Sequence, residues 1–387
     1  MKKRMRAMTG AEASAFAMKQ INPDVVAAYP ITPQTPVMQK FSQYVADGEV
    51  NTEFVRVESE HSAMSACVGA SAAGARVMTA TASAGLALMF EIVGVASGSR
   101  LPIVMSIVNR ALSAPINIHC DHGDSMGCRD LGWIQFYCET AQEAYEYTIL
   151  AIKLAEHKQI QTPVMVCQDG FITSHCVDNV ITYSTDLVRG FIGEYKPKKW
   201  LLNTKDPFTV GPLELTDYYF ETKRQQTHGI MNTFKIFPQV AKELRKITQK
   251  RYDYTAEYKL KDAEVAIVAM SSTCGIIKEV VDKLRKKGKK VGLLKVRMFR
   301  PFPYSTIRMR LDHLKSIIVM DRSESFGARP PLYGEVRNAL YKLDKRPKLM
   351  SCIYGLGGRD IYEKEIEKLF NDLLKGKEWE RRYVGVR

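Results

Sequence analysis

Short apolar runs alternate with longer helical stretches along the N-terminal part of the chain. The apolar runs end at polar, Gly or Pro residues and predict strands at 24–29, 52–57, 75–80, 101–108 and 162–168. The stretches between them predict helices at 10–19, 60–74, 83–97 and 141–160. Because the runs lack apolar–polar alternation, they favour strands buried on both faces of a parallel sheet built from βαβ units.

The pattern weakens over residues 184–255, where Lys, Pro, Tyr and Thr replace the apolar runs and a single helix is predicted at 233–251. A second, shorter block of alternation follows. Its predicted strands are 263–270, 290–296, 316–320 and 348–354, and its predicted helices are 275–287, 333–341 and 362–374. The fold class is therefore α/β, with a larger domain over 1–255 that includes the irregular connection 184–255, and a smaller domain over 256–387.

Length and composition are those of an ordinary globular protein. The chain has 387 residues, 45% of them hydrophobic, which is enough for two or three domains with substantial cores. The chain has no run of about eighteen apolar residues. The basic start, Met1 to Arg6, leads into Met-Thr-Gly rather than an apolar signal core. We therefore expect a cytoplasmic protein that does not contact a membrane.

The formal net charge of +14 suits a polyanionic partner such as nucleic acid, coenzyme A or an acidic electron carrier. Much of the charge lies at 196–199, 283–290 and 375–387, away from any nucleic-acid recognition motif. The run at 283–290 falls at a predicted helix end, where cations favour the helix dipole. A solvated basic face is the simpler interpretation, and no nucleic-acid partner is predicted.

The eight cysteines do not form a metal-binding pattern, since no two are spaced as C-x-x-C. An iron–sulfur or zinc site of the usual kind is therefore not predicted in this chain. Several of these cysteines lie inside apolar runs, and reduced core thiols are the expected state. They are Cys67, Cys120, Cys128, Cys138, Cys167, Cys176, Cys274 and Cys352.

Two short segments at predicted strand and helix ends contain the first candidate functional residues. Tyr-Pro-Ile-Thr-Pro at 29–33 ends a predicted strand, and its two prolines bar helix continuation, which leaves the hydroxyl of Thr32 at a strand mouth. About thirty residues later, Glu60 opens a predicted helix rich in small residues, with Ser59 as a possible N-cap. Taken alone, Glu60 reads as a capping acid stabilised by the helix dipole.

A strand-to-helix turn of small residues follows at 79–86 and includes Ser83 and Gly85. Its amides and hydroxyls are suited to lining a cofactor pocket, and tight packing is an equal alternative. It is neither a Rossmann nor a Walker fingerprint. Arg110 ends the strand after it and has the charged fork that suits a substrate carboxylate, with a structural ion pair as the alternative.

These segments, in this order and spacing, resemble the alpha chain of the 2-oxoacid:ferredoxin oxidoreductases, thiamine diphosphate enzymes best known as pyruvate:ferredoxin oxidoreductase or pyruvate synthase. The matching motifs are YPITP at 29–33, Ser-Glu-His at 59–61, NRALSAP at 109–115 and RDLGWIQ at 129–135. Segments 331–335 and 354–360 are similar to the transketolase C-terminal-like domain of these subunits. The resemblance implies a pyrimidine-binding domain of thiamine enzymes over 1–255, a mostly parallel sheet with helices on both faces, and a transketolase C-terminal-like domain over 256–387.

The resemblance also implies roles for individual residues. Glu60 matches the glutamate that hydrogen-bonds the aminopyrimidine ring of thiamine, with Glu58 as the substitute. Arg110 and Thr32 match residues that contact the carboxylate and carbonyl region of the 2-oxoacid. The cofactor-binding set then comprises Glu60, Tyr29, Pro30, Ser83 and Gly85.

The polar segment 121–135 is similar to the family's mobile loop over the active site, and its length and glycines suit a lid that excludes water. A zinc site is the weaker interpretation, because the spacings fit no common ligand pattern. The chain is therefore expected to bind no metal. The expected lid residues are Asp121, His122, Asp124, Arg129 and Asp130.

One absence shapes the expected assembly. The chain has no G-D-G motif, the element by which thiamine enzymes hold the diphosphate through Mg²⁺. The resemblance then implies an alpha subunit whose beta partner carries Mg²⁺ and shares thiamine diphosphate. Gamma- and delta-type partners and the beta subunit supply the 4Fe-4S clusters, coenzyme A is the cosubstrate, and ferredoxin or a similar carrier takes the electrons.

The expected reaction is reversible oxidative decarboxylation of pyruvate to acetyl-CoA and CO₂, in anaerobic metabolism and only with the partner subunits. A branched-chain (2-oxoisovalerate) enzyme is the alternative within the family, because its alpha chains carry similar motifs. Outside the family, a noncatalytic α/β scaffold subunit is the other candidate. A transketolase-like enzyme without iron–sulfur partners would need its own diphosphate motif.

Overall fold

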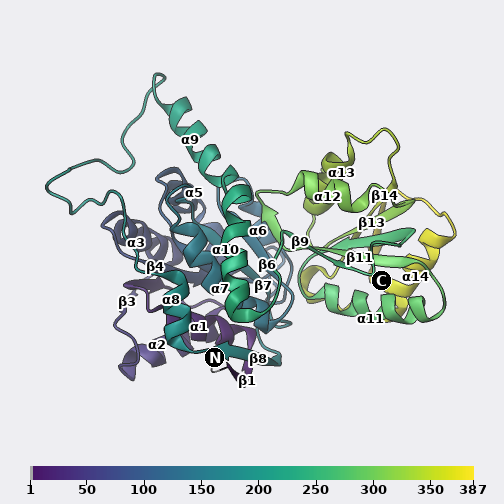
Figure 1. Ribbon diagram of the computed structural model, residues 1–387, viewed down its shortest axis with the longest axis horizontal. Coiled ribbons are helices and arrows are strands. Elements are labelled where there is room, and N and C mark those ends of the chain that lie inside the picture. The colour runs from purple at the N-terminus through teal and green to yellow at the C-terminus, as the bar shows by residue number, and fades with distance from the viewer. Residues whose placement is uncertain (1–2) are drawn as a thin grey trace.

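The computed structural model describes residues 3–387 and contains two lobes, which lie side by side in Figure 1. The first lobe is built on a seven-stranded sheet and the second on a six-stranded sheet. A ribbon of β1 (Lys3–Thr9) paired antiparallel with β8 (Val177–Tyr183) flanks the first lobe. Residues 1 and 2, which belong to the basic start considered above, lie outside the described residues.

The seven-stranded sheet has the order β12-β6-β7-β5-β4-β2-β3, and only the β12–β6 pair is antiparallel. Every residue of its four middle strands β4 to β7 is buried, which is why the sequence shows apolar runs here instead of alternation. The strands are β2 (Val25–Ala28), β3 (Glu53–Arg56), β4 (Val77–Thr81), β5 (Val104–Asn109), β6 (Ile134–Cys138), β7 (Val164–Asp169) and β12 (Met298–Arg300).

Helices cover both faces of this sheet, because successive strand side chains point to opposite sides. Val104 and Val108 pack with α1, α7 and α10, whereas Met105 and Ile107 pack with α3 and α5. The helices of the first lobe are α1 (Gly10–Ile21), α2 (Thr35–Ala46), α3 (Glu60–Ala72), α4 (Ser83–Leu88), α5 (Phe90–Gly98), α6 (Gly123–Gly127), α7 (Ala141–Ala155), α8 (Thr185–Ile192), α9 (Tyr219–Met231) and α10 (Thr233–Thr248).

The six-stranded sheet has the order β15-β14-β13-β10-β11-β9, with only β9 antiparallel to its neighbour. Its strands are β9 (Thr255–Tyr258), β10 (Val265–Ala269), β11 (Val291–Val296), β13 (Ser316–Asp321), β14 (Lys348–Tyr354) and β15 (Arg381–Val384). Its helices are α11 (Thr273–Lys286), α12 (Tyr304–Leu311), α13 (Pro331–Leu340), the 3₁₀ turn η1 (Leu356–Gly358) and α14 (Glu363–Leu374).

The two lobes share a core. Helices α11 and α14 cover one face of the second sheet. The other face, with α12 and α13, packs into the same apolar cluster as α3, α5 and the buried Trp133 of the first lobe. The short strand β12 comes from the second block of the chain but pairs with β6 of the first sheet. The sequence pattern did not predict this exchange, because a three-residue strand leaves no periodicity to detect.

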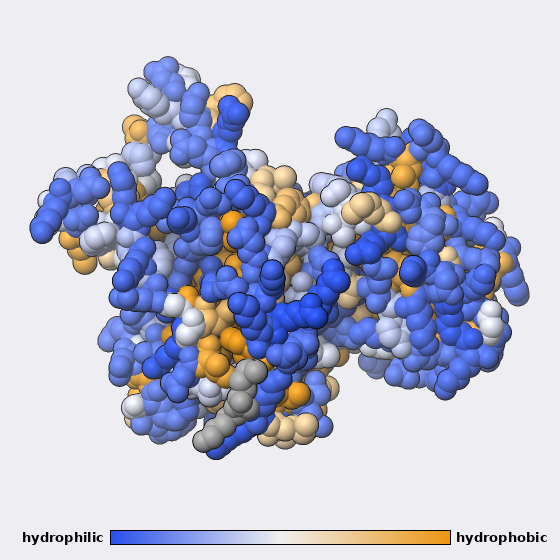
Figure 2. Space-filling view, in the orientation of Figure 1, coloured by the Kyte–Doolittle hydropathy of each residue, from blue (hydrophilic) through white to orange (hydrophobic). Residues whose placement is uncertain are grey.

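Two further differences concern helices. The single helix expected at 83–97 is two helices, α4 and α5, with the break at Met89. The weak region 184–255 contains three helices instead of one. Of these, α9 stands out from the first lobe at the top of Figure 1. Most of the face seen in Figure 2 is hydrophilic, and hydrophobic colour is confined to smaller patches. None of the helices formed by residues 3–387 is long and apolar enough to cross a membrane.

Candidate active site

The carboxyl ends of four neighbouring strands carry the residues that the sequence singled out. Thr32 follows β2, and Glu60 begins α3 directly after β3. Ser83 begins α4 after β4, and Arg110 follows β5. These strands are adjacent, in the order β5-β4-β2-β3. Because ligands of open α/β sheets bind at such strand ends, this edge of the sheet is the candidate active site.

Glu60 occupies a buried position in the first turn of α3. Ser59 is the N-cap predicted from the sequence, and its hydroxyl accepts a 3.2 Å hydrogen bond from the backbone N–H of Ser62. Glu60 is only 7% exposed. Glu58 is exposed and accepts a 2.6 Å hydrogen bond from the hydroxyl of Ser62. Of the two acids, Glu60 therefore faces the interior of the strand-end region.

The Glu60 side chain packs closely against Gly85. A Cβ atom at this position would lie 2.6 Å from Oε1 of Glu60 and 2.6 Å from Oγ1 of Thr81, well inside van der Waals contact. The hydroxyl of Thr81 is buried and has no hydrogen-bond partner among residues 3–387. A buried hydroxyl without a partner costs free energy, so the Thr81 hydroxyl is available to hydrogen-bond a polar group of a ligand.

Arg110 and Thr32 are brought together as the sequence analysis expected, but through the backbone. The Nη1 of Arg110 donates a 2.9 Å hydrogen bond to the carbonyl oxygen of Thr32, and its Nε donates one of 2.9 Å to the carbonyl of Asn117. No ion pair among the described residues involves Arg110. The side chain of Thr32 and the neighbouring Tyr29 and Pro30 are exposed at the strand end. Arg110 itself is only 7% exposed, and its guanidinium is held in place by these two carbonyls next to the exposed segment.

The expected lid is packed more deeply than a surface loop. His122 and Asp124 are 1% and 2% exposed, and Asp124 lies in the short helix α6 beneath the strand ends. Asp121 is half-buried and accepts a 2.9 Å hydrogen bond from the N–H of Gly123. Asp124 is fully hydrogen-bonded inside the protein, whereas His122 bonds Asp169 through Nε2 and its buried Nδ1 has no partner among residues 3–387. The role of this segment as a lid stays a prediction.

The far end of the same segment is more open. Asp130 has a side chain that is 73% exposed and lies 3.1 Å from Nη2 of Arg300. Arg129 is half-buried, with its Nε 3.6 Å from the carboxylate of Asp130. Movement of this end over the site stays a prediction.

A buried ionic cluster at the junction of the lobes was missed by the sequence analysis. Asp169, at the end of β7, accepts hydrogen bonds from Arg322 (2.9 Å), Ser271 (2.7 Å) and Ser272, and lies 2.8 Å from Nε2 of His122. Burial acts to raise the pKa of the Asp169 carboxyl, but Arg322 and His122 outweigh it and hold the pKa well below its usual range. Nothing local in the sequence marks Asp169, because its partners are distant in the chain.

The same cluster brings Cys120, His122 and Asp169 close enough to share a cation, with their ligand atoms within 4.8 Å of one another. Arg322 already supplies the positive charge, since its Nη1 also lies 3.8 Å from Sγ of Cys120. The geometry is therefore that of a charge-balanced ion pair, and burial raises the pKa of the Cys120 thiol well above its ordinary value.

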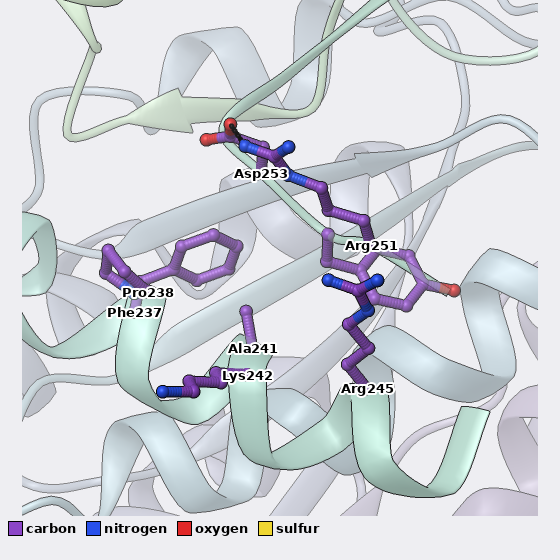
Figure 3. Close-up of a pocket in the computed structure, with 8 residues that line it drawn as sticks. Phe237, Pro238, Ala241, Lys242, Arg245, Arg251 and Asp253 are labelled. Carbon is purple, nitrogen blue, oxygen red and sulfur yellow. Dashed lines mark ion pairs between the residues drawn. The ribbon is translucent and has the colours of Figure 1, made fainter. Parts of the chain in front are cut away.

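Several cavities lie outside the strand ends, and two of them border features described here. One, of about 300 Å³, is formed by α10 and residues 251–253, and its labelled lining includes Phe237, Lys242, Arg245 and Asp253 (Figure 3). The other, of about 640 Å³, is lined by Asn117, His119 and the turn 356–360 of the second lobe. Asn117 connects this second cavity to the site, because its carbonyl binds Arg110 and its Nδ2 donates to the carbonyl of Gly357 at 3.1 Å.

Comparison with protein families identifies the chain. Residues 16–242 match the model described as pyruvate flavodoxin/ferredoxin oxidoreductase, thiamine diphosphate-binding, and residues 263–366 match pyruvate:ferredoxin oxidoreductase core domain II. The chain belongs to the pyruvate:ferredoxin oxidoreductase family. The predicted family is thereby confirmed, and with it a thiamine diphosphate-binding domain and membership of an oxidoreductase built from several subunits.

Curated relatives of this family member match over nearly its full length. The chain is 57% identical to the pyruvate synthase subunit PorA of Thermotoga maritima over 383 residues, which cover 98% of each chain. It is 45% identical to the subunit of the same name from Methanocaldococcus jannaschii, covering 99% of this chain and 98% of that one. Ketoisovalerate oxidoreductase subunit VorA of Pyrococcus horikoshii is 41% identical over 96% of this chain and 94% of its own length.

Solved structures confirm the fold class of this pyruvate:ferredoxin oxidoreductase family member. A 2-oxoglutarate:ferredoxin oxidoreductase from Magnetococcus marinus superposes with a TM-score of 0.74 at 20% identity, over 95% of this chain and 65% of that chain. A split-gene transketolase superposes with a TM-score of 0.58 at 13% identity, over 96% of this chain and 99% of that one. At these identities the likeness concerns the fold alone.

The strand ends of this family member hold groups that could hydrogen-bond a ring with donors and acceptors. They are the buried Glu60 carboxylate and the unpaired Thr81 hydroxyl, which lie close together beside Gly85. Thr81 was not among the residues expected to bind the cofactor. Its only sequence signal was its place in the small-residue turn 79–86.

Proposed function

We propose that this chain is the alpha subunit of an enzyme that converts pyruvate, coenzyme A and oxidised ferredoxin reversibly to acetyl-CoA, CO₂ and reduced ferredoxin. The observation that carries the proposal is that the buried Glu60, packed against Gly85, and the Arg110–Thr32 pair lie at one edge of the sheet in a member of this family. The names of the most similar curated relatives support the same reaction.

Glu60 would hold the cofactor in this proposal. Its buried carboxylate would accept a hydrogen bond from the aminopyrimidine ring, and Thr81 would satisfy its hydroxyl on the same ring. Tyr29, Pro30 and Ser83 would complete the wall of the pocket together with Gly85. When bound, thiamine diphosphate supplies the nucleophilic carbon for attack on the 2-oxo group and the sink for the electrons left after CO₂ departs.

Arg110 and Thr32 would bind the substrate. The guanidinium of Arg110 is held by the carbonyls of Thr32 and Asn117, so its orientation is set before substrate arrives. Such a preset cation is suited to the carboxylate of a 2-oxoacid. The exposed hydroxyl of Thr32 would donate a hydrogen bond to the carbonyl region of the same molecule.

The other components of the reaction would come from partner subunits of beta, gamma and delta type. This chain has neither a G-D-G motif for the diphosphate and Mg²⁺ nor a C-x-x-C pair for an iron–sulfur cluster. We therefore infer that the beta partner holds Mg²⁺ and that partners carry the 4Fe-4S clusters. Ferredoxin or a similar carrier would receive the electrons, and neither nucleic acid nor a membrane enters the proposal. A cytoplasmic location belongs to the same proposal.

The division of the chain into a pyrimidine-binding domain over 1–255 and a transketolase C-terminal-like domain over 256–387 is part of the proposal. It is supported by the change from one sheet to the other, which begins at β9 (Thr255–Tyr258). The exchanged strand β12 and the Asp169–Arg322 ion pair would hold the two domains in a fixed relative position.

A branched-chain 2-oxoacid is the second candidate substrate, because the VorA relative is 41% identical. The test is to purify the complex that contains this chain under anaerobic conditions and to measure coenzyme A-dependent viologen reduction with pyruvate, 2-oxoisovalerate and 2-oxoglutarate. We expect pyruvate to give the highest kcat/KM. A preference for 2-oxoisovalerate would change the substrate but keep the mechanism. An intact complex that is inactive with all three acids would refute the proposed function.

Substitution of Glu60 tests whether the chain is catalytic or a scaffold. Glu60→Gln keeps the shape but removes the charge, and we expect pyruvate-dependent turnover to fall by about 100-fold or more. Glu58→Gln is the matched variant, because Glu58 is exposed and bonds only Ser62 among the contacts of its side chain. It should retain near-normal turnover. Full activity of the Glu60→Gln complex would support a scaffold subunit.

A further inference from the structure

We propose that Asp124 is a positioning residue that holds the cofactor-side turn at Ser83 and the substrate arginine Arg110 in fixed relative positions. The inference rests on the proposed function and assigns Asp124 a role different from that of a mobile lid. It is carried by the hydrogen bonds of one buried carboxylate to two strand ends that are far apart in the chain.

The contacts of Asp124 are directed at both halves of the site. Its Oδ2 accepts a 2.9 Å hydrogen bond from the backbone N–H of Ser83 and a 3.0 Å bond from the backbone N–H of Arg110. Its Oδ1 accepts bonds of 2.8 Å from Nδ2 of Asn109 and 2.7 Å from the N–H of Ser125. A single oxygen atom therefore joins the turn after β4 to the end of β5.

The carboxylate form is the one that this environment requires. All four partners are N–H donors, so an ionised carboxylate satisfies each of them, whereas an amide or a protonated acid would turn a hydrogen toward at least one donor. Burial raises the pKa of the Asp124 carboxyl to about 6, while the bonds from Arg110, Asn109 and Ser83 act to lower it. Burying a charge without an oppositely charged side chain at hydrogen-bond distance costs free energy. Here the four N–H donors that bond the carboxylate offset that free-energy cost.

Positioning follows from where the donors belong. Ser83 has a positive φ of 46°, an uncommon conformation for a residue with a side chain, and its N–H is held by Asp124. Gly85 lies two residues after Ser83 in the same turn, and its backbone packs against the carboxylate of Glu60. The other end of the bridge is Arg110, whose guanidinium is aimed beside Thr32. Without the bridge, only the bond from the Ser83 hydroxyl to the carbonyl of Ala111 and the pairing of β4 with β5 would hold these segments together, and their relative position would be less well fixed.

The test is Asp124→Asn in the assembled complex. The amide can serve only part of the four donors, and the loss of charged hydrogen bonds is expected to raise both the KM for pyruvate and the dissociation constant of thiamine diphosphate by about tenfold or more. Cofactor affinity is measured by equilibrium titration of the cofactor-depleted complex, which needs no turnover. Unchanged KM and unchanged cofactor affinity would overturn the proposal.

Asp321→Asn is the matched control. Asp321 is also buried and accepts backbone N–H bonds, of 2.7 Å from Leu332 and 3.1 Å from Tyr333, but it lies in the second sheet away from the strand ends of the site. It should lose thermal stability with KM and cofactor affinity near wild type. If Asp124→Asn shows the same pattern, Asp124 is only structural and the proposal is wrong.

A second variant and the cofactor titrations test the role of Asp124 even if the first variant or the activity assay fails. If Asp124→Asn does not assemble, Asn109→Ala removes the Nδ2 donor that bonds both Asp124 and the hydroxyl of Ser125. A several-fold rise in KM or in the cofactor dissociation constant would support the bridge, while no change would overturn it. A wild-type complex without activity on 2-oxoacids would refute the proposed function, yet the cofactor titrations of the same variants would still judge the role of Asp124.

Discussion

Single residues at the strand ends set the shape of the site. Glu60 is a good helix-start acid by its sequence alone, and the structure adds that it is buried and that Gly85 lets its side chain pack closely against the turn after β4. The reason for a glycine at 85 is therefore clearance and not backbone conformation, since its φ is not among the positive ones. This distinction leads to a direct test.

Gly85→Ala should abolish most activity without unfolding the chain. The added Cβ would lie 2.6 Å from Oε1 of Glu60 and displace it, and displacements of this size typically lower turnover by roughly 100-fold. Gly94→Ala in the neighbouring helix α5 is the control, because nothing lies within 4 Å of a Cβ there. It should keep full activity and gain up to about 1 kcal/mol of helix stability. Equal activity of the two variants would argue against the proposed pocket.

At the scale of elements, the packing of α7 against β11 depends on buried charges. The Nζ of Lys295 lies 2.7 Å from Oε2 of Glu139 and 2.6 Å from Oε1 of Glu143, and Arg297 lies 3.3 Å from the same oxygen of Glu143. Burial acts to raise the pKa of Glu143, but Lys295 and Arg297 outweigh it and lower the pKa to about 2. Helix and strand are thus joined by a cluster whose strength depends on pH.

The cluster should stabilise the protein above about pH 4.5 and lose its effect as the pH falls toward 2. The folded pKa is lower than the ordinary value of 4.5, so the ionised carboxylate contributes about 3 kcal/mol at neutral pH, at 1.36 kcal/mol for each pH unit. Glu143→Gln should lower the midpoint of thermal unfolding at pH 7, with a smaller difference near pH 2. Glu378→Gln, in an exposed pair with Lys348, should change stability by less than about 0.5 kcal/mol. A pH-independent difference for Glu143→Gln would contradict the assignment.

At the scale of the whole molecule, the lobes are joined by a shared apolar core, by β12 and by the Asp169–Arg322 pair. The pair is almost fully buried, with side-chain exposures of 0% for Asp169 and 4% for Arg322. Removing one partner of such a pair leaves the other charge buried and unpaired. The arrangement of the lobes, and hence the position of the 356–360 turn beside Asn117, should depend on it.

Arg322→Met should weaken the junction by about 3 to 5 kcal/mol and separate the unfolding of the two lobes in calorimetry. Limited proteolysis between α10 and β9, over residues 249–254, should become faster. Arg285→Met is the control, because the partners of Arg285, which are Asp262, Val291 and Lys259, all belong to the second lobe. A single sharp transition at the wild-type temperature for Arg322→Met would show that the apolar core alone holds the lobes together.

The local part of the site was predictable from the sequence. Prolines around Thr32, the Ser59 cap before Glu60 and the small residues around Ser83 act through their own backbone, so a linear motif is enough to place them at strand ends. The buried runs of a parallel sheet were equally visible, because they need no partner information to be recognised. Family membership followed from the same motifs, and the family models agree with it.

The remaining features were decided by contacts between segments far apart in the chain. Asp124 reads as part of a polar loop, and only the approach of the turn at Ser83 and the end of β5 makes it a buried acceptor. Asp169 and Arg322 are 153 positions apart, and neither lies in a pattern that marks the other. Periodicity and motifs report local backbone preference, whereas burial and pairing of charge depend on which elements the fold brings together. The sequence therefore determined the chemistry offered at the strand ends, and the tertiary structure decided how that chemistry is held in place.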